Sequence, residues 1–236
     1  MDPLTFWLNG HRPEEFGLYL YDLPTIGTTS EGYESTDVPG KKGSLITPSG
    51  TVPSITIQLP LAILSRKLLA DMRMIRSWLS ADNNVGGILV LSETQDSFYE
   101  VQWLMRGELS RDLRRFGRFT ATAICYPYEF ERTGLEELET TEDKLFNPFE
   151  ECLPEYRISG EGMCTLTVNG ATMSANVGQN LTIDVRRMCA YRNDGSLMNT
   201  SVTGDYDELH LMPGENTVTI TSGFGLKVVP HWGWKA

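Results

Sequence analysis

The chain has 236 residues, with 31 acidic and 20 basic side chains and a net charge of −11. This length suits one large domain or two small ones, and 40% apolar residues with 10% aromatics are enough to form packed cores, which excludes wholesale disorder. An acidic chain with no extended basic face is a poor partner for a phosphate backbone, so no nucleic-acid specificity is expected.

Membrane insertion, secretion and metal binding find no support in the sequence. No stretch approaches the ~20 apolar residues of a membrane helix, so no membrane partner is expected. The start Met1-Asp2-Pro3 lacks the basic and then apolar pattern of a signal peptide. We therefore expect a protein made and kept in a cytoplasm, with reduced thiols. The four cysteines form no C-x-x-C pair and the three histidines are scattered, so neither a metal nor a cofactor is predicted.

The first half of the chain is predicted to be mostly strands with one helix. Ser65 can cap a helix that runs to about Ser80, because apolar residues recur at spacings of three and four. Asn and Gly residues between 82 and 87 would end it. The apolar stripe consists of Leu64, Leu68, Met72, Ile75 and Leu79. The strands expected beneath this helix span residues 52–59, 88–91, 98–105 and 119–125.

A group of arginines lies between the last two of these strands. Its members are Arg106, Arg111, Arg114, Arg115 and Arg118, offset by Glu108 and Asp112. The group is either a solvated hairpin tip or a charged contact with an acidic neighbour, since guanidinium forks pair well with carboxylates. The sequence alone favours neither interpretation.

An acidic stretch is predicted to join two domains. Residues 129–155 hold ten acidic side chains against two basic ones, and they interrupt the apolar periodicity on both sides. Part of this stretch, Leu135 to Leu145, could form a short solvated helix. We therefore predict a first domain over residues 1–134, an acidic linker over 135–153 and a second domain over 154–236.

The second half is predicted to be all strand. Residues 164–168 alternate between polar and apolar and lead into Asn169-Gly170, a strong hairpin signal. Asp194-Gly195 marks a second turn. Cys164, which alternates with Leu166 and Val168, is expected in the core. About eight short strands at turn spacing predict a jelly-roll or other β-sandwich of roughly 85 residues.

No catalytic motif is present, so an enzyme is not expected. The sequence lacks H-E-x-x-H, G-x-S-x-G and a P-loop lysine. The run Asp205-Tyr206-Asp207-Glu208 could hold Ca²⁺ through oxygen ligands, but it is more typical of a polar loop before the next strand.

The aromatic residues near the C-terminus allow two interpretations. Trp232 and Trp234, together with Tyr191, could stack against sugar rings. The alternative is that the chain end anchors itself on the body of the protein, with one tryptophan in a core and the other partly exposed, because they alternate along a strand. We favour the anchor.

Several short segments resemble one family when they are taken together and in order. The first set is Leu4 to Gly10, Phe16-Gly17-Leu18, Val38 to Gly43, Trp78-Leu79, and Phe116 to Phe119 leading to Cys125-Tyr126-Pro127-Tyr128. The second set is Ile158 to Gly162, Asn169-Gly170, Leu181 to Asp184, Leu211 to Asn216, and Val229 to Trp232. Their order and spacing resemble the distal tail protein (Dit) family of long-tailed phages that infect Gram-positive bacteria.

This resemblance implies a structural protein of the virion tail tip. It implies a mainly β fold, with a β-sandwich-like, ring-forming first domain that carries one helix and a galectin-like second domain. Six copies would form a ring between the tail tube protein and the tail-associated fibre or lysin protein, and receptor-binding proteins are a further partner to consider. Candidate ring or partner residues are Val38, Pro39, Gly40, Lys41 and Lys42 of one loop and Arg111, Arg114 and Arg115 of the arginine group. A carbohydrate-binding tail adhesin is the alternative function, and a wall hydrolase is a distant third.

Overall fold

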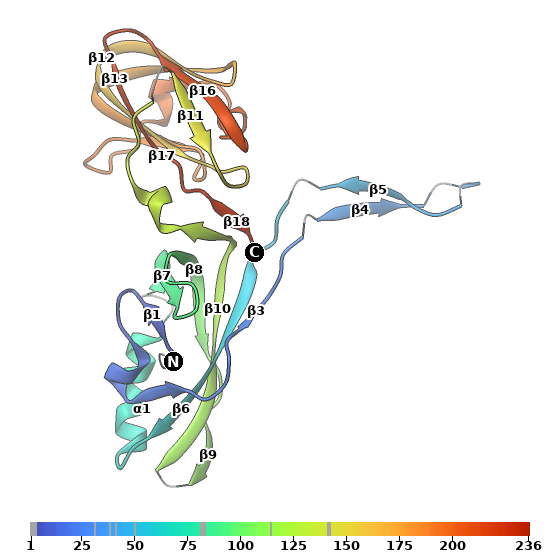
Figure 1. Ribbon diagram of the computed structural model, residues 1–236, viewed down its shortest axis with the longest axis vertical. Coiled ribbons are helices and arrows are strands. Elements are labelled where there is room, and N and C mark those ends of the chain that lie inside the picture. Colours follow the sequence, from blue (N-terminus) through green and yellow to red (C-terminus); the bar gives the residue numbers. More distant parts are fainter. Residues whose placement is uncertain are drawn as a thin grey trace. The chain divides into compact units, whose positions relative to one another are not determined.

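The computed structural model describes residues 4–30, 32–37, 39–40, 42–49, 51–80, 84–113, 115–140 and 143–236. The chain divides into two compact units (Figure 1). The first unit comprises Met1–Glu129 together with Lys235–Ala236, and the second unit comprises Phe130–Trp234. Strands dominate both units, and the described residues contain one α-helix, as the sequence predicted. The mainly β fold class is therefore confirmed.

A curled sheet forms the body of the first unit. Its strands run in the order β1-β7-β8-β10-β6-β2, with β3 added to β6 and with β9 and β18 added to β10. Strands β10 and β6 pair antiparallel from Phe116 opposite Leu64 to Cys125 opposite Ile55. The strands are β1 (Phe6–Leu8), β2 (Leu18–Leu20), β3 (Thr25–Ile26), β6 (Ile55–Leu64), β7 (Gly87–Leu91), β8 (Ser97–Arg106), β9 (Ser110–Leu113), β10 (Phe116–Glu131) and β18 (Gly233–Lys235).

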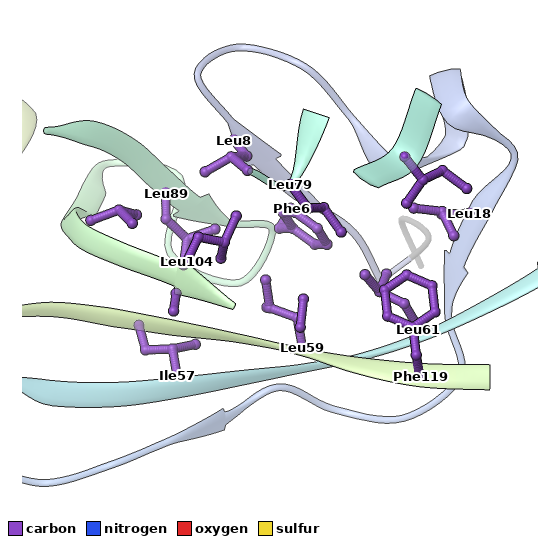
Figure 2. Close-up of a cluster of buried hydrophobic side chains, with 14 of the residues drawn as sticks. Phe6, Leu8, Leu18, Ile57, Leu59, Leu61, Leu79, Leu89, Leu104 and Phe119 are labelled. Carbon is purple, nitrogen blue, oxygen red and sulfur yellow. The ribbon is translucent and has the colours of Figure 1, made fainter. Parts of the chain in front are cut away.

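The helix α1 (Leu68–Trp78) packs its apolar stripe into the core of this sheet. Leu68, Met72 and Ile75 are buried there, as the periodicity predicted. Leu64 does not belong to this stripe, because it ends β6 and is 70% exposed. Figure 2 shows part of this core, where side chains from β1, β6 and β10 meet. The predicted start is wrong by two residues: Lys67 is the N-cap, and the Ser65 hydroxyl accepts a hydrogen bond from the Lys67 amide at 2.9 Å. The short 3₁₀ helix η1 (Pro13–Phe16) precedes β2.

The inward face of β8 changes phase within the strand. Tyr99 and Val101 are buried, but the next buried apolar residue is Leu104. Trp103 and Met105, which alternate with Tyr99 and Val101 in the sequence, are 48% and 45% exposed. Strict alternation in the sequence therefore does not assign the face of this strand throughout its length.

A second sheet forms the second unit, in the order β11-β16-β12-β13-β14, with β15 on β13 and β17 on β12. The long β12–β13 hairpin turns at Asn169 and Gly170, whose φ angles of 50° and 93° suit the predicted tight turn. Cys164 is buried, as predicted. The strands are β11 (Lys144–Asn147), β12 (Glu155–Val168), β13 (Ala171–Asp184), β14 (Cys189–Tyr191), β15 (Val202–Thr203), β16 (Gly214–Ile220) and β17 (Gly225–Val229), and the 3₁₀ helices are η2 (Arg132–Leu135), η3 (Asn199–Ser201) and η4 (Tyr206–Glu208).

The acidic stretch differs from the predicted linker. Residues 144–147 form β11, which pairs with β16 from Lys144 opposite Thr217 to Asn147 opposite Gly214. Leu145 and Asn147 face inward and are buried, and the Asn147 amide donates to the Glu150 carbonyl oxygen at 2.7 Å. The proposed helix between 135 and 145 is not present among the described residues there. The charges cover the outside of a segment whose inward side chains belong to the second core.

Candidate functional site

A hairpin of the first unit stands out because it forms a sheet of its own. Among the described residues, strands β4 (Tyr33–Thr36) and β5 (Leu45–Pro48) pair only with each other, from Tyr33 opposite Pro48 to Thr36 opposite Leu45. Backbone hydrogen bonds continue the ladder toward the main sheet: the Gly32 amide donates to Thr51 O, and the Gly27 amide donates to Thr56 O, both at 2.8 Å. The hairpin is therefore a continuation of the strands β3 and β6.

The two faces of this hairpin differ in chemistry. Alternation and register place Tyr33 and Ile46 on one face, where they are 67% and 65% exposed. The other face carries Glu34 and Thr47 with Leu45, which is 46% exposed. A two-stranded hairpin without a covered apolar face is marginally stable in water, and its outer edges leave backbone groups unpaired. These features are typical of a surface that another chain covers.

The described members of the predicted loop lie at the tip of this hairpin. Pro39, Gly40 and Lys42 are exposed, whereas Val38 and Lys41 lie outside the described residues. The Ser44 hydroxyl donates to the Asp37 carboxylate at 2.6 Å and closes the base of the loop. Sequence analysis identified this tip but missed the two strands behind it. The signal was present in residues 45–47, an apolar pair followed by threonine.

The predicted arginines lie at the β9–β10 hairpin of the main sheet. Arg111 and Arg115 are exposed, and Arg114 lies outside the described residues. The guanidinium of Arg118 lies 5.8 Å from the ring centre of Tyr21, a cation–π distance. The structure thus places the loop residues and Arg111 on two different sheets. Their shared role in an interface stays a prediction.

The two tryptophans occupy unlike environments, as their alternation predicted. Trp232 is 8% exposed, and its indole N–H donates to the Thr133 hydroxyl at 3.2 Å. Trp234 is 42% exposed and meets Phe149 edge to face at 4.8 Å. Tyr191 lines a cleft of the second unit whose lining includes neither tryptophan. The structure therefore does not bring the three proposed sugar-stacking residues together, and this part of the hypothesis is corrected.

The remaining chemical candidates have structural roles. The Asp205 carboxylate accepts a hydrogen bond from the Asp207 amide at 3.0 Å and caps η4, which is the polar loop expected there. Within the described ranges, no group of three or more His, Cys, Asp or Glu residues is placed to hold a metal ion. Burial raises the pKa of the Cys125 and Cys152 thiols to about 12, which makes them poor nucleophiles. None of the described helices is long and apolar enough to cross a membrane.

Comparison with known proteins identifies the fold. No protein-family model matches this sequence, and no curated protein matches it. Among solved structures, the chain is similar to the Dit protein (gp 19.1) of SPP1, described as a paradigm of the hub adsorption apparatus in phages that infect Gram-positive bacteria. The similarity covers 95% of this chain and 97% of that chain, with a TM-score of 0.59 and 12% sequence identity. The chain therefore has a Dit-like fold over nearly its whole length.

Proposed function

We propose that this protein is a structural hub of a phage tail tip, and that six copies assemble into a ring through the first unit. The observation that carries the proposal is the β4–β5 hairpin, which exposes Tyr33 and Ile46 on a sheet that gains no third strand from the part of the chain that the structure describes. The Dit-like fold supports the location at a tail tip. In this proposal the protein is not an enzyme.

In the proposed ring, a neighbouring copy would cover the exposed side chains of the hairpin. In a closed ring, each copy can lay its hairpin on the next copy, and rotational symmetry repeats that contact until no hairpin is left uncovered. The exposed Trp103 and Met105 on β8 supply apolar surface on the same unit that a neighbour could cover. Burying such side chains stabilises the assembly by roughly 25 cal/mol per Å².

The ring would join other tail proteins. One face would meet the tail tube protein, and the opposite face would meet the tail-associated fibre or lysin protein, with receptor-binding proteins as further partners at the periphery. The exposed loop residues Pro39, Gly40 and Lys42, and the exposed Arg111 and Arg115, are proposed contacts within or around this ring. The protein would be made in the host cytoplasm and carried out in the virion.

Light scattering of the purified full chain tests the ring. The wild-type protein should give a mass near six times 26.5 kDa at micromolar concentration. Ile46→Glu places a charge on the apolar face of the hairpin and should shift the protein to the monomer. Thr47→Glu adds the same charge to the opposite, polar face and should leave the ring intact. A wild-type protein that stays monomeric, even beside its tube protein, would refute the ring.

A second experiment asks which unit assembles. Because the hairpin belongs to the first unit, we propose that the fragment 130–234 folds as a monomer. The first unit needs its C-terminal residues for this comparison, since the Ala236 amide donates to Pro127 O at 3.0 Å and its carbonyl accepts from Thr29 N at 2.8 Å. Rings formed by the fragment 130–234 alone would overturn the assignment.

A further inference from the structure

A cleft on the second unit has the shape and the chemistry of a binding site. Its volume is about 780 Å³, within the usual range for small-molecule sites. Its floor is the outward face of the sheet formed by β17, β12, β13 and β14. The inward face of the same strands carries core residues such as Tyr156 and Ile158. The cleft lies within the second unit and does not depend on the proposed ring.

The register of the strands arranges the floor in rows. Arg157 of β12 lies opposite Lys227 of β17 on one side and opposite Thr182 of β13 on the other. Thr182 in turn lies opposite Tyr191 of β14. Four residues with hydrogen-bonding groups therefore form one row across four strands; Arg157, Lys227 and Tyr191 are accessible, whereas Thr182 is buried. Neighbouring strands are about 4.8 Å apart, so this row spans about 14 Å, longer than a single sugar ring.

A second row runs beside the first. Ser159 lies opposite Asn180 on β13 and opposite Gly225 on β17. A Cβ atom at Gly225 would come within 2.4 Å of the Ser159 hydroxyl oxygen, so glycine keeps this part of the floor open. The Asn180 side-chain oxygen accepts a hydrogen bond from the Asn193 backbone amide at 2.9 Å. This bond fixes which end of the Asn180 side chain is the oxygen, so that its NH₂ group is the end that can donate to a ligand. The second row thus offers a hydroxyl and an amide.

An acidic loop closes one side of the cleft. Leu138 forms a bridge with Val228 of β17, which sets Glu137 and Glu139 at the edge of the floor. The Glu137 carboxylate receives hydrogen bonds from both Arg157 and Lys227, each at 2.7 Å. These bonds, from Lys227 first and then Arg157, lower the pKa of Glu137 and keep it charged. The two cations of the cleft are therefore already paired.

The charge balance selects the class of ligand. Two carboxylates and two cations line the cleft, and both cations hold Glu137. A phosphate or other anion would have to displace that carboxylate, and a cation would have to compete with Arg157 and Lys227. A neutral ligand rich in hydroxyl groups avoids both costs, because each hydroxyl can donate and accept. It can match the amide, hydroxyl and carboxylate groups of the floor and lie against the Tyr191 ring.

We propose that this cleft binds a neutral oligosaccharide, with Arg157, Ser159, Asn180 and Glu139 as hydrogen-bonding groups and Tyr191 as the aromatic contact. The site differs from the stacking group suggested by the sequence, since neither Trp232 nor Trp234 takes part. A cleft four strands wide should hold several sugar rings, so an oligosaccharide should bind more tightly than the corresponding monosaccharide.

The test uses the full chain on an array of neutral and anionic oligosaccharides, followed by calorimetry with the neutral oligosaccharide that binds most strongly. Tyr191→Ala and Ser159→Tyr, which remove the aromatic contact and fill the floor, should each weaken binding at least tenfold. Two control variants change exposed residues outside the cleft lining. Met163→Tyr alters a side chain on the same exposed side of β12, and Trp234→Ala removes an exposed tryptophan. Both should leave the affinity unchanged.

Three results would overturn the proposal. One is no binding to any neutral oligosaccharide on the array. Another is preferred binding to anionic glycans or to inorganic phosphate. The third is binding that Trp234→Ala abolishes and Ser159→Tyr does not change, which would move the site to the chain end. Circular dichroism of each variant confirms that the second unit is folded, and the two independent cleft variants keep the test decisive if one fails to fold.

Discussion

The β4–β5 hairpin and the sheet of the second unit use the same kind of alternating strand but differ in what covers them. In the second unit, the inward side chains of β12 and β13 meet others from β11, β14 and β16 in a closed core. In the hairpin, the described side chains of β4 and β5 remain exposed. Alternation specifies which side chains share a face, whereas only a second packed layer gives that face a stabilising role. One region stabilises its own unit, and the other leaves its described side chains exposed.

The largest expected effect is the difference in unfolding free energy between two tyrosine-to-alanine variants, one in each region. Tyr156 is fully buried, and its hydroxyl donates to the Leu209 carbonyl oxygen at 2.8 Å. Tyr156→Ala should lower the free energy of unfolding by roughly 3–5 kcal/mol, because it leaves a cavity and an unpaired carbonyl. Tyr33→Ala on the hairpin should change it by less than about 0.5 kcal/mol. Urea unfolding of the monomer measures both. Equal losses would mean that the hairpin is already part of a core.

The tryptophan pair gives the next effect within the second unit. Trp232→Ala should cost about 3 kcal/mol, because the indole packs closely enough that a Cβ at Gly134 would lie 2.8 Å from its ring. Trp234→Ala should cost less than about 1 kcal/mol, since that side chain keeps 42% of its surface exposed. Thermal unfolding of the two single variants checks the difference. Matching shifts in Tm would contradict the anchor.

A smaller effect depends on pH. Burial would raise the pKa of Glu155, but hydrogen bonds from His231 at 3.1 Å and Arg157 at 3.0 Å outweigh it and lower the pKa to about 2. Since the folded-state pKa is depressed, this stabilisation is present above about pH 4.5 and is lost as the pH falls toward 2. The wild-type protein should therefore lose roughly 2 kcal/mol of unfolding free energy through Glu155 as the pH falls from about 4.5 toward 2, and Glu155→Gln should remove this part of the pH dependence.

The control for this pH effect is Glu215→Gln. Glu215 pairs with Lys144 at 2.9 Å, but both side chains are more than half exposed, so the pair contributes little. Urea unfolding at pH 6 and at stepwise lower values compares the two variants with the wild type. An unchanged pH profile in Glu155→Gln would contradict the role of this buried carboxylate.

The smallest effect is a difference in thiol reactivity. Cys189 is partly exposed, whereas Cys125 in the first core and Cys152 in the second are buried with a pKa of about 12. Brief alkylation of the native protein at pH 8 should modify Cys189 first, as mass spectrometry of the peptides would show. Cys125 and Cys152 should react only when their own unit opens. Rapid labelling of Cys125 in the native state would contradict the closed core of the first unit.

Local patterns predicted much of the fold and little of the surface chemistry. Short-range spacing and backbone preference predict the apolar stripe of α1 from Leu68 onward and the turn at Asn169-Gly170, and the structure confirms both. The acidic stretch has the composition of a linker because charges dominate it, but Leu145 and Asn147 face a core. The cleft could not be foreseen, since its residues come from five separate segments and only strand register brings them together.

Local sequence patterns are enough to predict a mainly β protein with one helix, in which Trp232 is buried and Trp234 is partly exposed. Those features depend on period, turn chemistry and alternation within short segments. Only the tertiary structure decided that the face of β8 changes phase after Val101, that β4 and β5 form a separate sheet, and that Arg157 and Tyr191 share one cleft. The physical reason is that pairing and burial join residues far apart in the chain, and no local pattern specifies which strand becomes the neighbour of another.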